Sequence, residues 1–281
     1  MRKFAILAFL LLANAAGLAA QGGGNGDPAG GAGPVHTESL GFKGFTGICN
    51  KGNVEVIYTA GGEYSVILEE SGAARSTVRL EEGTITVSCP GDAGKCSTTL
   101  RVTAPALETL ENYGNMQLTC GGKQPGVLEI ENYGNMSFAA DSLSADSMTL
   151  ENNGNIKAKV TEPGVRGLGV ENNGSMKLET VVKINTLVIE NNGMLDGRLT
   201  AEAQTLELGN NGLCTLEAVY KGGKATITNR GNSKLSLDVD CATLNAANSG
   251  LSEMAFSGTA DSVRIDGAGR SHVDVSQLNN F

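Results

Sequence analysis

Tryptophan is absent from the 281 residues, aromatic residues make up only 4%, and there are two histidines. So few aromatic side chains suit a long, narrow interior filled by small and aliphatic residues. His36 lies in a Gly-rich segment and His272 close to the end of the sequence, so a Ser-His-Asp triad has little to work with. No GxxxxGK[ST] phosphate loop and no zinc-type Cys/His spacing occurs. We therefore expect no catalytic residue, no metal and no cofactor.

Long hydrophobic runs are missing after the first twenty residues. Arg2 and Lys3 precede an apolar run from Phe4 to Leu12 and small residues up to Ala20, which predicts a signal peptide over residues 1–20. No later segment is apolar enough to span a bilayer. We therefore expect export to the periplasm, the cell surface or the medium. Residues 21–38 are Gly-rich and are expected to form a flexible linker before a domain at 39–281.

Positive charge is also in short supply. The whole chain has 21 basic and 30 acidic residues, a net charge of −9. Removing Arg2 and Lys3 leaves 21 − 2 = 19 basic residues and a net charge of 19 − 30 = −11. This balance argues against nucleic acid and against anionic membranes as partners.

Glycine, in contrast, is abundant and regularly spaced. Nine glycines follow one another at intervals of 20 residues, then 19: Gly114, Gly134, Gly154, Gly174, Gly193, Gly212, Gly231, Gly250 and Gly269. Such regularity is typical of stacked copies of one structural unit. We expect Gly at each turn because it accepts a positive φ angle.

Each copy has the same pattern around its glycine. Apolar residues recur at every second position, for example Leu150 before Gly154 and Ala158 and Val160 after it, which predicts strands with one buried face. Asparagine stands two residues before the glycine in eight of the nine copies: Asn112, Asn132, Asn152, Asn172, Asn191, Asn210, Asn229 and Asn248. This asparagine has the parity of the apolar residues and therefore points inward.

A meander of antiparallel hairpins and a coil with one turn per repeat are both compatible with alternating strands. The asparagines favour the coil, because an inward amide needs a partner and stacked amides can bond from one rung to the next. We therefore predict an all-β fold. It is a single-stranded parallel β-helix of about 9–10 coils, right-handed by default, with a structural asparagine ladder.

Residues 39–106 depart from the strict repeat that fills residues 107–275. Asn50-Lys51-Gly52-Asn53 resembles an early copy, and the alternating runs that follow it predict antiparallel hairpins. We assign this part as an N-terminal cap, since an open sheet edge invites pairing with other chains. No equivalent cap is apparent at the C-terminal end, where we expect a homo-oligomer contact.

The ordered set of short motifs resembles one known family. It comprises Phe45-Thr46-Gly47-Ile48, the turn and strand Glu82-Gly83-Thr84-Ile85-Thr86-Val87, the segment Val102–Leu107 and the repeated Gly-Asn-apolar turns. The chain is similar over about residues 40–275 to the putative auto-transporter adhesin, head GIN domain family of exported bacterial proteins. The resemblance implies a β-helical, adhesin-like surface protein and supplies no catalytic residues.

Six cysteines are present, and export permits them to pair. Cys89 and Cys96 flank a short turn-rich loop and are the best candidates for a disulfide. Cys120 falls at an inward position, where a buried thiol acts as a small hydrophobe. Spacing leaves the pairing of the remaining three open: Cys49, Cys214 and Cys241.

The best candidate ligand-binding feature is a row of outward carboxylates three residues before the glycines, with two tyrosines beside it. Either the carboxylates splay into solvent or cations such as Ca²⁺ lie between them. The tyrosines either stack against a sugar ring or simply cover the surface of the strands. The residues are Glu111, Glu131, Glu151, Glu171 and Glu190, with Tyr113 and Tyr133.

Three functions remain open from the sequence. The first is a non-enzymatic, adhesin-like surface or envelope protein that presents a flat face to a glycan or a surface protein. The second is a carbohydrate-active enzyme of the lyase or glycosidase type, which would need acids that converge in a groove. The third is a structural module that assembles through its uncapped end.

Overall fold

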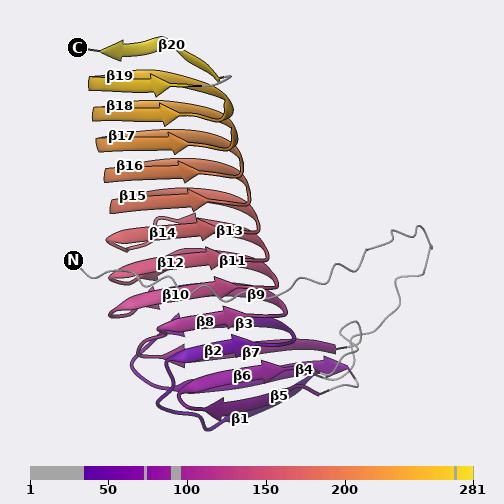
Figure 1. Cartoon of the computed structure of the whole chain (residues 1–281). Coiled ribbons are helices and arrows are strands. Elements are labelled where there is room, and N and C mark those ends of the chain that lie inside the picture. Colours follow the sequence, from indigo (N-terminus) through magenta and orange to yellow (C-terminus); the bar gives the residue numbers. More distant parts are fainter. Residues whose placement is uncertain (1–34, 73–74, 90–95, 269–270, 281) are drawn as a thin grey trace, which may run out of the picture. The chain divides into compact units, whose positions relative to one another are not determined.

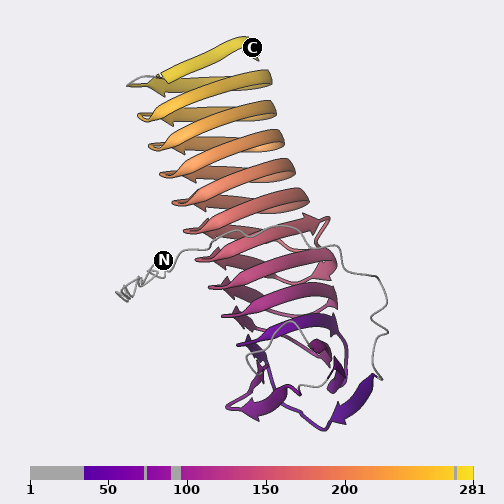
Figure 2. The same ribbon diagram turned by 90° about the vertical axis from the view of Figure 1, so that its right-hand side faces the viewer.

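The computed structural model describes residues 35–72, 75–89, 96–268 and 271–280, and every regular element in these ranges is a β-strand. The strands join into one sheet that winds upon itself as a stack of flattened coils (Figure 1). Seen from the side, successive coils lie directly above one another (Figure 2). The predicted signal peptide and most of the predicted linker lie outside the described residues, and β1 begins at His36.

The strands have the following bounds: β1 His36–Leu40, β2 Gly47–Asn50, β3 Asn53–Ala60, β4 Ser65–Gly72, β5 Thr77–Glu81, β6 Thr84–Ser88, β7 Cys96–Ala104, β8 Thr109–Asn112, β9 Asn115–Lys123, β10 Val127–Asn132, β11 Asn135–Ser144, β12 Ser147–Asn152, β13 Asn155–Thr161, β14 Gly167–Asn172, β15 Ser175–Asn191, β16 Met194–Asn210, β17 Leu213–Asn229, β18 Asn232–Asn248, β19 Leu251–Gly267 and β20 Ser271–Asn280.

The two repeat lengths correspond to two ways of building a coil. In the 19-residue copies one strand of 17 residues runs round the whole coil and a two-residue turn joins it to the next, so that 17 + 2 = 19. In the 20-residue copies the stretch between two such turns is split into two shorter strands, such as β9 and β10. The parallel stack predicted from the repeat is confirmed.

Pairing between coils places equivalent residues in register. Ile130 of β10 lies between Leu110 and Leu150, and the asparagines of the same strands pair in the same way. This vertical register puts every inward apolar row into one continuous core that runs the length of the stack. The core includes Cys120, whose thiol is buried as expected.

The inward asparagines form the predicted ladder. Each Nδ2 donates to the Oδ1 of the next asparagine at 2.6–2.8 Å, from Asn50 to Asn248, and all are at most 4% exposed. The same Nδ2 also reaches two carbonyls: for Asn152 these are Gly154 O and Ser175 O, both at 3.1 Å. At the far end Asn248 donates to the Ser252 hydroxyl. Each amide thus ties its own turn to the coil that follows.

The repeat glycines are needed for a reason other than the one expected. The positive-φ glycines of the described residues include Gly83, Gly122 and Gly126, but none of the repeat glycines from Gly114 to Gly250. A Cβ at a repeat position would instead overlap the carbonyl oxygen of the glycine one coil earlier, as at Gly154 over Gly134. The expectation of positive φ is therefore wrong, and close approach between coils is what excludes a side chain.

At the N-terminal end, the strands do not stack in the order in which they follow one another in the sequence. β2 and β3 pair in parallel with β8 and β9, so Asn50 starts the ladder as its sequence motif predicts. On their other side β2 and β3 pair in parallel with β6 and β7, which add one more layer beneath. β1, β4 and β5 then pair antiparallel at this end, so the predicted N-terminal antiparallel strands are present.

The predicted Cys89–Cys96 disulfide stays a prediction, because the side chain of Cys96 lies outside the described residues. Cys89 Sγ lies 3.4 Å from Asn53 O and 3.2 Å from the Ser76 hydroxyl. Cys49, Cys214 and Cys241 are buried as free thiols. Burial raises the pKa of the Cys214 thiol to about 12, so it stays protonated at neutral pH.

We predict that Asn152→Leu or Asn172→Leu lowers the free energy of unfolding by about 1–3 kcal/mol, because the neighbouring ladder amide loses a buried partner. Chemical denaturation of each variant measures the change. Exposed Asn155→Leu on the same coil is the control and should have little effect. Parent-like stability of both buried variants would contradict a structural role for the ladder.

We predict that Gly154→Ala destabilises the protein by at least about 2 kcal/mol, since the new methyl group meets a backbone carbonyl that cannot rotate away. The matched control is Gly169→Ala in β14, where the nearest atom to an added Cβ is Thr149 Cγ2 at 3.8 Å. We expect the control to stay within about 0.5 kcal/mol of the parent. Thermal melts of the two variants compare them, and equal losses would refute the close-approach explanation.

Candidate binding face

The predicted glutamate row lies on one outward face of the stack. The strands β8, β10, β12, β14 and β15 each contribute one member, and the pairings place neighbouring members in register. We call the five residues the Glu row: Glu111, Glu131, Glu151, Glu171 and Glu190. In a parallel stack, equivalent residues of neighbouring coils are about 4.8 Å apart, a spacing at which like charges repel. The next coil carries Gly209 in place of a carboxylate.

In other charged rows of the stack, side chains of opposite charge lie on neighbouring coils. Lys183 Nζ lies 2.9 Å from Glu202 of the next coil, Lys221 Nζ lies 3.1 Å from Asp240, and Arg198 Nε lies 3.2 Å from Glu217. Such alternation of sign favours the vertical register, even though each exposed pair contributes little. In the strand pairings of the described residues, the Glu row is the only place where carboxylates stack in register.

Tyr113 and Tyr133 stack face to face beside the first two members of the row. Their ring centroids are 5.0 Å apart with an interplanar angle of 4°, and the side chains are 51% and 44% exposed. Each hydroxyl donates to the carboxylate two residues earlier, Tyr113 to Glu111 at 3.1 Å and Tyr133 to Glu131 at 3.0 Å. The rings are therefore held flat against the face by their own strand.

An exposed amide row continues the tyrosine positions, as the run of asparagines one residue before the glycines indicates. Asn153 and Asn173 donate to Glu151 at 2.8 Å and to Glu171 at 3.2 Å. Asn173, Asn192 and Asn211 each donate to the amide of the preceding coil at 2.8–3.1 Å, opposite in direction to the buried ladder. The face thus offers carboxylates, stacked rings and amides in adjoining rows.

Partial burial raises the pKa of the Glu131 carboxyl. The hydrogen bond from Tyr133 acts against this shift, whereas the carboxylates of Glu151 and Glu111 add to it. Burial and the adjacent Glu111 also raise the pKa of Tyr113 to about 12. The pKa of Tyr133 is raised by burial and by Glu131. The face therefore disfavours further negative charge, and a cation or a hydrogen-bond donor would relieve that repulsion.

His272 is exposed at the outward position expected for a surface residue. Within the described ranges, no three or more His, Cys, Asp or Glu residues are grouped so as to hold a metal ion. In the same ranges, no helix has the length and apolar character needed to cross a membrane.

The family model described as "Putative auto-transporter adhesin, head GIN domain" matches residues 206–280, which confirms the predicted resemblance over that segment. No curated protein is similar enough in sequence to match the chain.

Several solved structures are similar at low sequence identity. A putative adhesin from Parabacteroides merdae is 13% identical with a TM-score of 0.48, and 86% of this chain and 96% of that chain are covered. A putative adhesin from Bacteroides fragilis is 15% identical with a TM-score of 0.40, covering 88% and 97%. A putative lipid binding protein from Parabacteroides distasonis is 13% identical with a TM-score of 0.48, covering 86% and 96%.

We predict that Glu131→Gln lowers the pKa of Tyr133, because a neutral amide no longer repels the tyrosinate. Glu190→Gln is the control, since Glu190 belongs to the same row but has no tyrosine beside it. The titration is followed by NMR of isotope-labelled tyrosine at alkaline pH. A pKa of Tyr133 that both variants leave unchanged would show that Glu131 does not control this phenol.

Proposed function

We propose that the protein is a non-enzymatic, adhesin-like surface or envelope protein whose Glu row and stacked tyrosines contact a ligand or partner. The observation that supports this is the like-charged row itself. Opposite charges would serve the cohesion of the coils better, as they do elsewhere in the same stack. The match of residues 206–280 to an adhesin-type domain family agrees with this function.

The chemistry of the face favours a sugar ligand, held directly or through a bridging cation. Flat aromatic rings pack against the apolar face of a pyranose, and the neighbouring carboxylates and amides accept and donate hydrogen bonds to hydroxyl groups. Carboxylate oxygens also suit Ca²⁺, which would neutralise the row as the ligand binds. A surface protein that carries exposed glycans or basic side chains would meet the same groups.

A carbohydrate-active enzyme is the second candidate, and one observation favours it. Glu131 combines a raised pKa with a neighbouring carboxylate one coil away, a spacing of the order used by retaining glycosidases, whose carboxyl groups are about 5 Å apart. Glycosidases need these groups on both sides of the scissile bond, however. Here the carboxylates follow one line on an outward face, which suits binding better than cleavage.

Export through the predicted signal peptide would bring this face into contact with ligands outside the cytoplasm. Self-association through the C-terminal end is a further part of the proposal. β20 pairs with β19 on one side, and no described strand pairs with its outer edge. An open edge of this kind is able to accept a strand from a second copy.

We predict that the triple variant Glu131→Gln, Glu151→Gln and Tyr133→Ala folds like the parent, because all three side chains point outward, and loses ligand binding. Binding is measured on a glycan array for the parent and the variant, with calcium and with a chelator. A loss with the chelator as well as in the variant identifies a cation-bridged ligand.

The control triple variant is Glu253→Gln, Asp261→Asn and Val219→Ala, which removes two carboxylates and one exposed apolar side chain outside the Glu row. It should bind like the parent. If a glycan binds and the first variant retains it as well as the control does, the face is only solvated surface. Shortened glycans recovered after incubation would favour the enzyme instead.

A further inference from the structure

A second break in the charge pattern lies on the other side of the glycine turn. Lys157 of β13 and Lys177 of β15 are in register. In the strand pairings of the described residues, they are the only two basic residues that stack on each other. Both are exposed, and neither takes part in an ion pair within 4.0 Å among those residues. As with the Glu row, stacking like charges works against cohesion.

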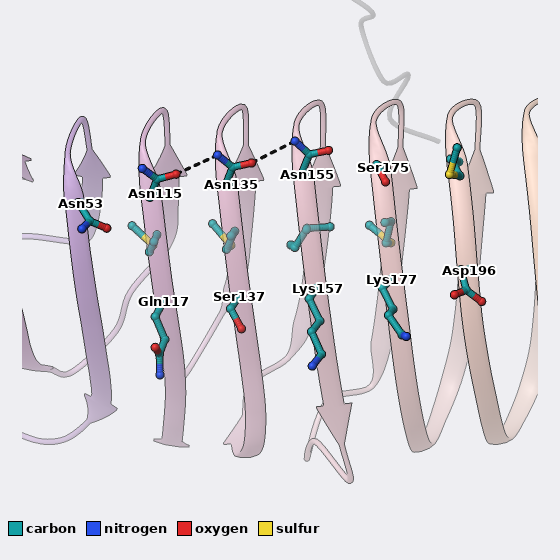
Figure 3. A pocket seen from close by; sticks show the side chains of 15 residues that line it. Asn53, Asn115, Gln117, Asn135, Ser137, Asn155, Lys157, Ser175, Lys177 and Asp196 are labelled. Carbon is teal, nitrogen blue, oxygen red and sulfur yellow. Dashed lines mark hydrogen bonds between the residues drawn. The ribbon is translucent and has the colours of Figure 1, made fainter. Parts of the chain in front are cut away.

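The two lysines line a groove of about 680 Å³ that runs across several coils (Figure 3). One rim is formed by Asn115, Asn135 and Asn155, and the lysines lie on the other rim, one coil after the other. Between the rims the groove is floored by thioether and aliphatic side chains, including those of Met116 and Met136, which are 4% and 5% exposed. The groove therefore combines an apolar floor with one amide rim and a second polar rim, on which the two lysines lie between Ser137 and Asp196.

The amide rim is already ordered but retains capacity for a ligand. Asn135 donates to Asn115 at 2.8 Å, and Asn155 donates to Asn135 at 3.0 Å. Each carboxamide has two N–H groups and two oxygen lone pairs, so the ladder bond uses only one donor and one acceptor. The rim thus presents a donor and an acceptor at each of these three coils, at the regular spacing of the stack.

The groove changes character further along the stack. Asp196 is in register with Lys177. The amide rim ends at Asn155 and is followed by Ser175 and then by Met194 and Leu213, which are 52% and 48% exposed. These neighbours would repel an anion or leave its hydroxyl groups unpaired. The cationic, amide-rich section is therefore confined to the coils around Lys157.

We propose that this section of the groove binds a linear polysaccharide that carries anionic groups, with Lys157 and Lys177 on the anions and the amide rim on the hydroxyls. A chain ligand fits because the polar contacts extend along the groove, with amides on the coils of Asn115, Asn135 and Asn155 and lysines on the coils of Lys157 and Lys177. The net charge of the exported chain, 19 − 30 = −11, does not prevent this, since salt screens charges beyond about 8 Å and the Glu row lies across the turn. This site is separate from the Glu row and does not depend on the function proposed for it.

The test uses the exported chain and three probes: polygalacturonate for carboxylate groups, heparin for sulfate groups and dextran as a neutral polysaccharide. Binding to one or both anionic polymers, with no binding to dextran, is expected. Lys157→Gln with Lys177→Gln should weaken it by about tenfold or more, because charge-assisted hydrogen bonds are lost. Asn135→Ala should also weaken it while leaving the thermal melt unchanged.

The control Lys224→Gln with Lys234→Gln removes the same charge from other exposed positions and should change affinity by less than about twofold. Equal weakening by the two double variants would overturn the proposal, as would failure of both anionic polymers to bind. Single-stranded DNA bound as tightly as the polysaccharides would also overturn it. Loss of binding to the anionic polymers in the Glu-row triple variant alone would assign the ligand to the other face.

Discussion

Vertical contact between equivalent residues is the constraint on which the rest of the structure depends. The buried amides bond from Asn50 to Asn248, and the repeat glycines bring each turn against the carbonyl of the turn before it. Both interactions require the same residue at the same place in successive coils. Because the amides are almost fully buried, a shift of one residue would leave several of them without partners and would turn the apolar rows outward.

The same constraint arranges the outward side chains in rows, each formed by equivalent positions of successive coils. A residue that recurs with the repeat must stack on its own copies, so like charges are forced together unless the sign alternates. It does alternate at Lys183, Glu202, Lys221 and Asp240. The Glu row and the lysine pair do not follow this rule. A ligand of opposite charge, or a cation in the case of the Glu row, offers a physical reason for both exceptions.

Much of this could be predicted from the sequence, because the interactions are periodic and local patterns reveal them. The spacing of glycine and asparagine gave the parallel coil, the inward ladder and the outward Glu row. The layer formed by β6 and β7 beneath β2 and β3 could not be predicted, since the pairing joins segments out of sequence order. The role of the repeat glycines was misjudged for a related reason: φ is a local property, whereas the carbonyl that excludes a side chain belongs to the previous coil.

Because inward and outward residues alternate along each strand, the outward residues can vary in chemistry while the core stays the same. Within one coil Glu151 faces solvent, whereas Asn152, its neighbour in the chain, is fully buried. The stability of the stack therefore constrains Asn152 but leaves the side chain at position 151 free to differ. An outward row can change its chemistry along the stack, from amide to Met194 and Leu213, without disturbing the core beneath. The Glu row nevertheless repeats over five coils a choice that cohesion disfavours. The fold itself does not explain this repetition, and the ligand contact that we propose would.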